Sequence, residues 1–475
     1  MVTVHPTGGL TTVIRQAEPI GVLFGLKIGF ESFSYWKDDN HMSIQSTDNS
    51  KAFLPGLNPV TPSSKVTPWD YPYPTSPTIK GLQVRMVDDA IKLGVGHAAI
   101  NLNIGNILRP AKTDQTITFI IDGREFYFDG AYLTGFDKQV KELSDRGIVV
   151  NLILLNSPVW DGIEIHPDLR SVLLHPDYDP EGRISVFNVV TEEGLAYYKA
   201  FIGFVAERYT RPDAQYGRAC GYIIGNEVDT QWVWCNAGEK TVDVYVREYA
   251  VAMRTAFDIA RRIYRQARVY ISLTHLWNMT HEDNPVRYYR GREVIEKLNE
   301  ISTRDGNYDW SVAYHPYPEN LSQGKFWEDK TAIDSFDTPR ITFKNIEILP
   351  RYFSQPHLLY DGRLRHIILS EQGFHSDESE ESERIQAAAY AFAYWKIAQI
   401  HGIESFILHA HVDHRDEFGL NLGLWRRDKA SPIPNAPGSP KPIYFVFRDI
   451  DGPNQQDVFQ KAREVIGEEH WKSIP

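Results

Sequence analysis

The chain has 475 residues, of which 42% are hydrophobic and 12% aromatic, a composition that supplies a large core and excludes disorder along the whole chain. The formal net charge is −12, and the sequence has no Lys/Arg-rich run. Nucleic acid is therefore not expected as a partner, and neutral or cationic ligands fit the charge better.

From about residue 84, amphipathic helical stretches alternate with short apolar or β-branched runs, which is typical of βα units around a parallel sheet. Seven strands are expected from residue 97 onward, and an eighth must lie upstream, at either Ile20–Lys27 or Ile79–Leu82. The fold class is therefore predicted to be α/β, a (β/α)8 TIM barrel with an N-terminal elaboration and long βα loops. The seven strands are 97–103, 148–155, the run ending at Glu227, 268–275, 310–315, the run ending at Glu371, and 404–409.

One domain is expected over residues 1–475: an N-terminal strand and surface elaboration at 1–80, the barrel at about 81–450, and a C-terminal helical tail at 451–475. The segment Lys37–Thr78 is polar and rich in Pro and Ser, so it either covers a surface or forms a rim to the site. Helices are predicted at 87–93, 136–146, 191–209, 246–265, 294–302, 384–399 and 442–448.

Two carboxylates lie at strand ends. Glu227 closes the run Gly-Tyr-Ile-Ile-Gly-Asn-Glu and Glu371 closes Arg-His-Ile-Ile-Leu-Ser-Glu. With the upstream strand counted first, they end strands four and seven, at the face where barrels carry their chemistry. A carboxylic acid facing a carboxylate across this face indicates cleavage of a glycosidic bond, with about 5–5.5 Å between them for retention and about 6.5–9.5 Å for inversion.

A resemblance to a known group of enzymes rests on three motifs: Asn226-Glu227, Glu371 in Ser-Glu-Gln-Gly, and His315-Pro-Tyr317. Together, in this strand order, they resemble the clan A retaining glycoside hydrolases, such as the cellulase-like family five and the xylosidase-like family thirty-nine. The resemblance covers roughly residues 80 to 450. It implies that Glu227 is the general acid/base, Glu371 the nucleophile, Asn226 a ligand of the substrate 2-hydroxyl, and Tyr317 a contact of the nucleophile.

The sequence departs from this pattern in two places. The run Asn101-Leu-Asn-Ile-Gly, at the end of the second strand, lacks the Arg of many clan members, and the eighth strand ends in His409-Ala-His411 where a Trp is common. The resemblance therefore leaves the sugar, its anomeric configuration and its linkage open. Exo or endo action and the oligomeric state are open as well.

The assigned roles require different protonation states. Burial and the negative charge of Glu371 are expected to raise the pKa of Glu227 so that it donates a proton to the leaving oxygen. Hydrogen bonds from Tyr317 and His315 are expected to keep Glu371 ionised. Once the glycosyl ester forms on Glu371, the pKa of Glu227 falls and it can act as base for water.

Other polar or aromatic residues near strand ends are candidates for binding the substrate, an oligosaccharide, a polysaccharide or a small glycoside. The polar ones are expected to contact hydroxyl groups, and each Trp either packs a loop or stacks on a sugar. The candidates are His275, Asn156, Asn101, His315, His409, His411, Trp160, Trp232, Trp234, Trp277 and Trp425.

Two alternatives remain. His409, His411 and His414, with Asp413, have a spacing at which imidazoles can bind zinc, which would make the chain a metal-dependent barrel hydrolase. The second alternative is a carbohydrate-binding barrel that has lost catalysis. The leading interpretation, hydrolysis by two carboxylates, requires no cofactor and no metal.

The two cysteines, Cys220 and Cys235, lie on either side of the Glu227 strand end, too far apart for a disulfide unless the loop folds back, so two free thiols are expected. The first residues show no signal peptide, and no later segment approaches 18 uncharged apolar residues. A cytoplasmic protein that does not span a membrane is expected, although a secreted chain trimmed of its signal would look the same.

Overall fold

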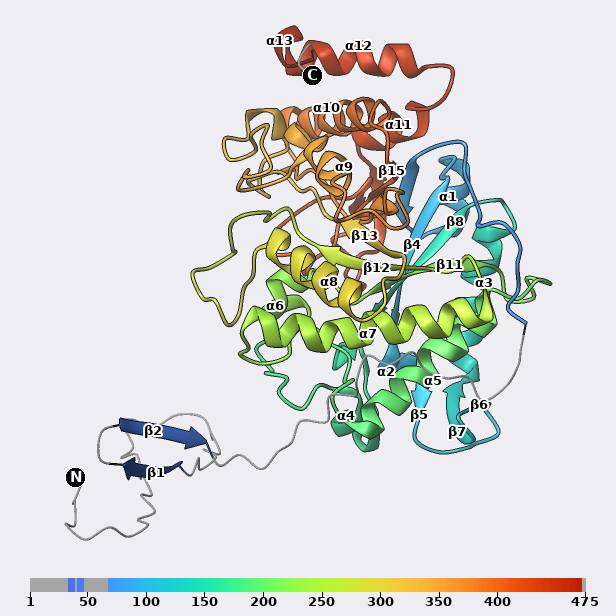
Figure 1. The fold of residues 1–475 in the computed structure, drawn as a ribbon. Coiled ribbons are helices and arrows are strands. Elements are labelled where there is room, and N and C mark those ends of the chain that lie inside the picture. The colour runs from blue at the N-terminus through green and yellow to red at the C-terminus, as the bar shows by residue number, and fades with distance from the viewer. Residues whose placement is uncertain (1–32, 39–40, 47–66, 472–475) are drawn as a thin grey trace. The chain divides into compact units, whose positions relative to one another are not determined.

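A computed structural model describes residues 33–38, 41–46 and 67–471 (Figure 1). The chain divides into two compact units, 1–53 and 54–475. In the first unit, β1 (Phe33–Asp38) pairs with β2 (His41–Ser46) as an antiparallel hairpin. The candidate first barrel strand at Ile20–Lys27 lies outside the described residues.

The second unit is built on a closed barrel of eight parallel strands, which confirms the predicted TIM barrel. The first strand is the candidate near Ile79–Leu82, because this segment pairs with the last strand on one side and with the second on the other. In barrel order the strands are β3 (Lys80–Gln83), β4 (His97–Asn103), β8 (Val149–Leu155), β11 (Ala219–Ile224), β12 (Arg268–Leu273), β13 (Trp310–Tyr314), β14 (Ile367–Leu369) and β15 (Ile403–Leu408).

Each predicted helix occurs, with shifted ends. Side chains cap several of them, for example Thr191, which accepts a hydrogen bond from the backbone of Gly194 at the start of α5. The acidic run 377–383 enters the first turn of α10, where negative charge is favourable. The helices are α1 (Val87–Lys92), α3 (Gly130–Ser144), α5 (Glu192–Tyr209), α7 (Val242–Ile263), α8 (Gly291–Arg304), α10 (Glu380–Ile397) and α11 (Pro442–Asp449).

The connections carry further elements. The short helices are α2 (Ile104–Ile107), α4 (Pro167–Leu173), α6 (Gln231–Trp234) and α9 (Ile348–Phe353), and α12 (Gln455–Ile466) and α13 (Glu468–Trp471) follow α11. Two small hairpins pair β9 (Val159–Trp160) with β10 (Ile163–Glu164), and β16 (Trp425–Arg427) with β17 (Pro437–Pro440).

The sequence analysis did not predict a three-stranded sheet after β4, formed by β5 (Leu108–Arg109), β6 (Thr116–Ile121) and β7 (Arg124–Asp129). Its apolar face packs on α5, where the ring of Phe128 stacks on Phe204 with 3.8 Å between centroids. The sheet therefore extends the outer layer of the barrel and does not add a strand to it.

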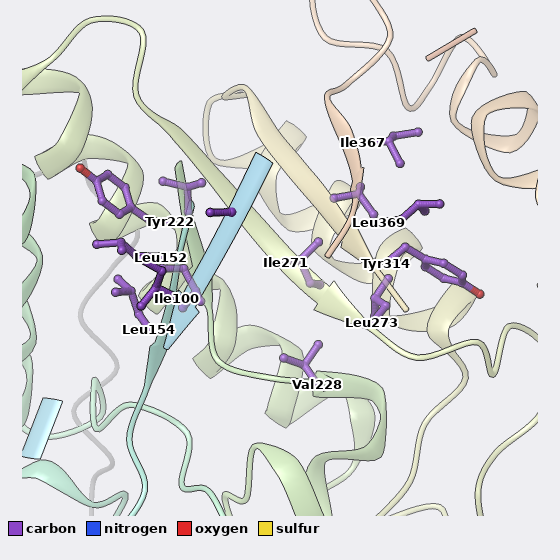
Figure 2. Packing of buried hydrophobic residues seen from close by; sticks show 14 of the residues in the cluster. Ile100, Leu152, Leu154, Tyr222, Val228, Ile271, Leu273, Tyr314, Ile367 and Leu369 are labelled. Carbon is purple, nitrogen blue, oxygen red and sulfur yellow. The ribbon is translucent and has the colours of Figure 1, made fainter. Parts of the chain in front are cut away.

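Strand residues alternate between two apolar layers. The outward-facing ones pack against the helices, and Figure 2 shows part of this layer. The inward-facing ones fill the barrel with a separate cluster, so the barrel has a packed core. The inner cluster comprises Ala99, Ile153, Leu155, Ile184, Ile223, Tyr270, Ala313, Ile368 and Ile407.

Residues 67–78 cover the amino ends of the strands. Tyr71 stacks on Tyr264 at 4.3 Å between ring centroids. The hydroxyl of Tyr73 donates a hydrogen bond to Asn151 Oδ1 at 3.2 Å, and the guanidinium of Arg268 lies 3.7 Å from the centroid of the Tyr73 ring. This described part of Lys37–Thr78 is therefore a surface cover at the end of the barrel opposite the strand ends that carry Glu227 and Glu371.

Gly221→Ala tests this packing, because a Cβ atom at residue 221 would lie 2.0 Å from Asn151 Oδ1 and 2.9 Å from the Tyr73 hydroxyl. We expect the free energy of unfolding, measured in urea, to fall by about 1–3 kcal/mol. Gly135→Ala on α3 is the control, since a Cβ there meets nothing within 4 Å. If Gly221→Ala were as stable as the original chain, the close packing of β11 against β8 and Tyr73 would be contradicted.

Candidate active site

The turn after β11 places Glu227. Gly225 has φ +75°, and a Cβ there would lie 2.8 Å from Cys235 Sγ. Glu227 itself has φ 40° and ψ 60°, a left-handed conformation that is strained for a residue with a side chain. Its backbone N–H donates to Ser272 Oγ at 3.0 Å, and its carbonyl accepts from Thr230 N at 2.9 Å. These bonds hold the strained turn and with it the carboxylate.

A second acid, Asp229, links this turn to Thr274, the residue that follows β12. Asp229 is fully buried and accepts hydrogen bonds from the backbone N–H and the hydroxyl of Thr274. Burial raises the pKa of Asp229 to about 7, against the effect of the Thr274 hydrogen bonds and with the effect of the Glu227 charge. The sequence analysis did not identify Asp229, because nothing in the sequence distinguishes it from an ordinary loop acid.

Glu371 follows β14 and is held by two donors. Its Oε1 accepts from the Tyr317 hydroxyl at 3.1 Å, as the resemblance implies. Its Oε2 accepts from Gln83 Nε2 at 3.0 Å. Gln83 is the last residue of β3, and it was missed because the first strand was undecided in the sequence.

His315 lies beside the two acids, Glu227 and Glu371. Its Nδ1 lies 2.9 Å from Glu227 Oε1, and its Nε2 lies 3.1 Å from Ser370 Oγ. One ligand-type atom each from Glu227, His315 and Glu371 lie within 4.8 Å of one another. A carboxylate oxygen of Glu227 is therefore no more than 4.8 Å from one of Glu371.

Histidine charges surround Glu371. Burial would raise the pKa of Glu371, but the charges of His409 and His315 and the Gln83 hydrogen bond outweigh it, so this pKa lies below its ordinary value. Burial likewise opposes a charged His409, yet Glu371 and Glu417 raise its pKa to about 9. The pKa of His315 is also raised, since the charges of Glu371 and Glu227 overcome its burial. The site therefore pairs an ionised Glu371 with a cationic His409 and with a His315 imidazole whose pKa is raised.

Glu417 extends this network. Its Oε1 lies 3.3 Å from His409 Nε2, and His409 Nδ1 lies 2.7 Å from Gln83 Oε1. A chain of contacts thus runs from Glu417 through His409 and Gln83 to Glu371. The sequence analysis treated Asp413–Asn435 only as a loop and did not predict Glu417 in the site.

Several predicted binding residues lie near this centre. Asn226 and Asn101 are half-buried, and Asn101 faces the same side of β4 as Ala99 of the inner cluster. Trp160 and Trp234 are partly buried and pack on that cluster.

The buried Nδ1 atom of His275 has no hydrogen-bond partner among the described residues. Burial, followed by the charge of Arg340, lowers the pKa of His275 to about 3. It is therefore a neutral imidazole, and it lies two residues after the end of β12.

Other predicted binding residues are structural, which corrects the sequence analysis. Asn156 is fully buried and donates to the carbonyls of Leu173 and Val186. Trp277 is fully buried and donates to the carbonyl of Phe336. The sequence alone does not distinguish such side chains from those that face a substrate, because both follow a strand.

Three more predicted binding residues belong to this structural group. Trp232 is only 6% exposed, and the Arg287 guanidinium lies 3.7 Å from its ring centroid, so this face is not free for a sugar. His411 Nε2 and Trp425 Nε1 both contact Asp89 Oδ2, at 3.0 and 2.9 Å. His411 and Trp425 therefore anchor α1.

The histidine cluster does not form a metal site. His409 contacts Gln83 and Glu417, His411 contacts Asp89, and His414 Nδ1 accepts from the backbone of Asp416. Within residues 67–471, the one group of His, Cys, Asp or Glu side chains close enough to hold an ion is Glu227, His315 and Glu371. Two carboxylates and an imidazole are suitable ligands for zinc.

Two remaining expectations concern the whole chain. Cys220 and Cys235 are free thiols, as predicted, and both are buried. Among the described helices, none has the length and apolar character needed to cross a membrane.

Comparison with known proteins gives a family and a fold. The model of a family of unknown function (DUF5722) matches residues 72–474. None of the curated proteins matches. A family 39 glycoside hydrolase from Bacteroides cellulosilyticus WH2 has a similar structure, with TM-score 0.52 and 14% identity over 89% of this chain and 70% of that one. Fpglu1 from Fervidobacterium pennivoraus has TM-score 0.50 and 13% identity over 82% of this chain and 86% of that one. At these identities the likeness shows the barrel fold.

His409→Gln tests the charge network through stability. A group with a raised folded pKa stabilises fully below its unfolded pKa of roughly 6.5, and this contribution is lost as the pH rises through the folded value. The folded pKa of His409 is about 9, so the original chain should lose free energy of unfolding as the pH rises from roughly 6.5 to about 9, and a chain without this histidine should not lose this part. In urea unfolding we expect this loss to exceed that of His409→Gln by about 1–3 kcal/mol.

The exposed His401→Gln is the control and should follow the original chain. Parallel stability curves for His409→Gln and the original chain would contradict a charged His409.

Proposed function

We propose that this chain, which belongs to the DUF5722 family of unknown function, is a retaining glycoside hydrolase with Glu371 as nucleophile and Glu227 as general acid/base. The observation that carries the proposal is the approach of the two carboxylates to within 4.8 Å. Retention requires about 5–5.5 Å between the carboxyl groups, whereas inversion requires about 6.5–9.5 Å to admit a water. The short separation supports retention.

In the first step, Glu371 attacks the anomeric carbon as the bond to the leaving oxygen breaks, and Glu227 gives its proton to that oxygen. A glycosyl ester on Glu371 and a free alcohol result. In the second step, a water gives a proton to Glu227 and attacks the anomeric carbon, which releases the sugar and restores the Glu371 carboxylate. Atoms and charges balance without a cofactor.

The neighbours of Glu371 suit a nucleophile. Tyr317 and Gln83 donate to its two oxygens, and His409 and His315 favour its charge. These donors orient the carboxylate before the substrate arrives, so that less reorganisation accompanies the attack.

A carbohydrate substrate fits the side chains around the two acids. Asn226 and Asn101 can bind hydroxyl groups, and Trp160 and Trp234 offer aromatic surface. The barrel shared with the family 39 glycoside hydrolase supports this class of substrate as an analogy of fold.

Glu371→Gln and Glu227→Gln test the assigned roles. On aryl glycosides we expect each to lower kcat/KM, by about 10²–10⁴-fold where acid/base catalysis is lost. Glu328→Gln, at an exposed surface position, should retain full activity. Proton NMR of the first-formed anomer should show the configuration of the substrate. An inverted first product would contradict the mechanism, and so would full activity of either site variant.

Azide distinguishes the two acids. In Glu227→Ala, azide should enter through the glycosyl-enzyme and give a glycosyl azide of retained configuration, whereas in Glu371→Ala it should attack directly and give the inverted azide. The same configuration from both variants would contradict the separate roles. Turnover that survives in Glu371→Gln but is abolished by a chelator would favour a metal centre on Glu227 and His315 in place of this mechanism.

Gln83→Leu tests how Glu371 stays ionised. Loss of the donor at 3.0 Å should raise the pKa of Glu371, because the hydrogen bond favours its charged form. We expect the acid limb of the kcat/KM profile to move up by roughly 0.5–1 pH unit. Gln399→Leu, at an exposed position in the turn after α10, should leave the profile unchanged. An unshifted limb in Gln83→Leu would contradict the role of this bond.

A further inference from the structure

One contact crosses the carboxyl end of the barrel. Phe418 lies in the loop after β15, the eighth strand. Its ring centroid lies 4.4 Å from the Arg183 guanidinium, which belongs to the connection after the third strand, and 5.9 Å from the ring of Trp234, after the fourth. The eighth and fourth strands stand on opposite sides of a closed eight-stranded barrel. We name this group of Phe418, Arg183 and Trp234 the cross-mouth contact.

The cross-mouth contact is fixed on both sides. Trp234 packs on the inner cluster of the barrel, and Ile184, next to Arg183, is a member of that cluster. On the other side, Glu417 precedes Phe418 and reaches His409 at the end of β15. Phe418 has φ +52°, a left-handed backbone conformation, and its ring contacts Arg183 and Trp234. Adjacent residues of one loop therefore attach to opposite walls of the barrel.

The contact lies on a particular side of the site. Around the ring, β3 and β4 stand between β15 and β8, so the cross-mouth contact spans the ends of these two strands. Gln83 ends β3 and donates to Glu371, and the half-buried Asn101 lies near the end of β4. A sugar unit on Glu371 that used these polar groups would have the cross-mouth contact beside it and could not continue as a polymer in that direction.

We propose that the cross-mouth contact makes the site specific for chain ends, so that the enzyme removes terminal units or splits short glycosides and does not cut within a glycan. The proposal rests on the glycoside hydrolase function proposed above. It adds Phe418 as a residue that determines specificity by obstructing longer chains.

The test uses the full chain with two sets of probes. Aryl glycosides report whether any hydrolysis occurs. Hexasaccharides of β-1,4-linked glucose, xylose and mannose, labelled at the reducing end with 2-aminobenzamide, report where a chain is cut. We expect cleavage of an aryl glycoside together with hexasaccharides that are either shortened one unit at a time from one end or left intact.

Products cut at internal bonds would overturn the proposal while leaving hydrolysis established. A lack of turnover with both sets of probes would instead overturn the proposed function and this inference with it.

Phe418→Ala removes the obstruction. This residue is 59% exposed, so the variant should fold. We expect the rate of internal cleavage of a hexasaccharide to rise about tenfold, with little change on aryl glycosides. Phe445→Ala is the matched control, because Phe445 is 46% exposed and also has one aromatic and one arginine neighbour, on α11.

An unchanged product pattern in Phe418→Ala would overturn the proposal. The same change in Phe445→Ala would overturn it too, because the effect would then not depend on the cross-mouth contact.

Discussion

The arrangement depends on keeping Glu371 charged within 4.8 Å of a second acid. Two carboxylates at this distance disfavour each other's ionisation, and burial adds to the cost. The chain offsets the cost on Glu371 with the imidazoles of His409 and His315, which favour its charged form, and with hydrogen bonds from Tyr317 and Gln83. In the proposed mechanism, this difference in surroundings lets two residues of the same type take different roles.

A closed barrel makes this asymmetry possible. Five different strands, the first, fourth, sixth, seventh and eighth, carry at or just after their ends the residues Gln83, Glu227, His315, Glu371 and His409. Closure brings these strand ends to one face although the residues span 326 positions of the chain. Glu227 has a strained left-handed backbone conformation. The hydroxyl of Ser272, on the neighbouring strand, accepts a hydrogen bond from its backbone N–H and stabilises the turn.

The parts of the account that could be predicted from sequence are those with a local signal. Short apolar runs between amphipathic helices indicated seven of the eight strands and left two segments as candidates for the first. Glu227 and Glu371 were singled out as acids at the ends of such runs, and His315 and Tyr317 were added by the resemblance. Whether a strand-end residue faces the site or the core has no local signal. Asn156 and Trp277 are buried and donate hydrogen bonds to backbone carbonyls, and the sequence does not reveal those partners.

Gln83 was missed because the first strand was undecided in the sequence, although it donates directly to Glu371. Glu417 was missed because its link to the site passes through His409, a contact that the sequence does not reveal. The sheet β5–β7 does not follow the alternation of βα units from which the barrel was predicted, although Asp122-Gly123 between two β-branched or aromatic runs is a local signal for its hairpin.

The most direct test of the central claim is covalent trapping of the nucleophile. The chain would be incubated with the 2,4-dinitrophenyl 2-deoxy-2-fluoro glycoside of a sugar that it hydrolyses, then digested and sequenced by tandem mass spectrometry. A 2-fluoro group slows release more than attack, so a glycosyl ester should accumulate. The account predicts one added fluorosugar per chain, on Glu371, and none in a chain carrying Gln at that residue. A label on another residue would contradict it, and so would turnover of this reagent with no ester formed.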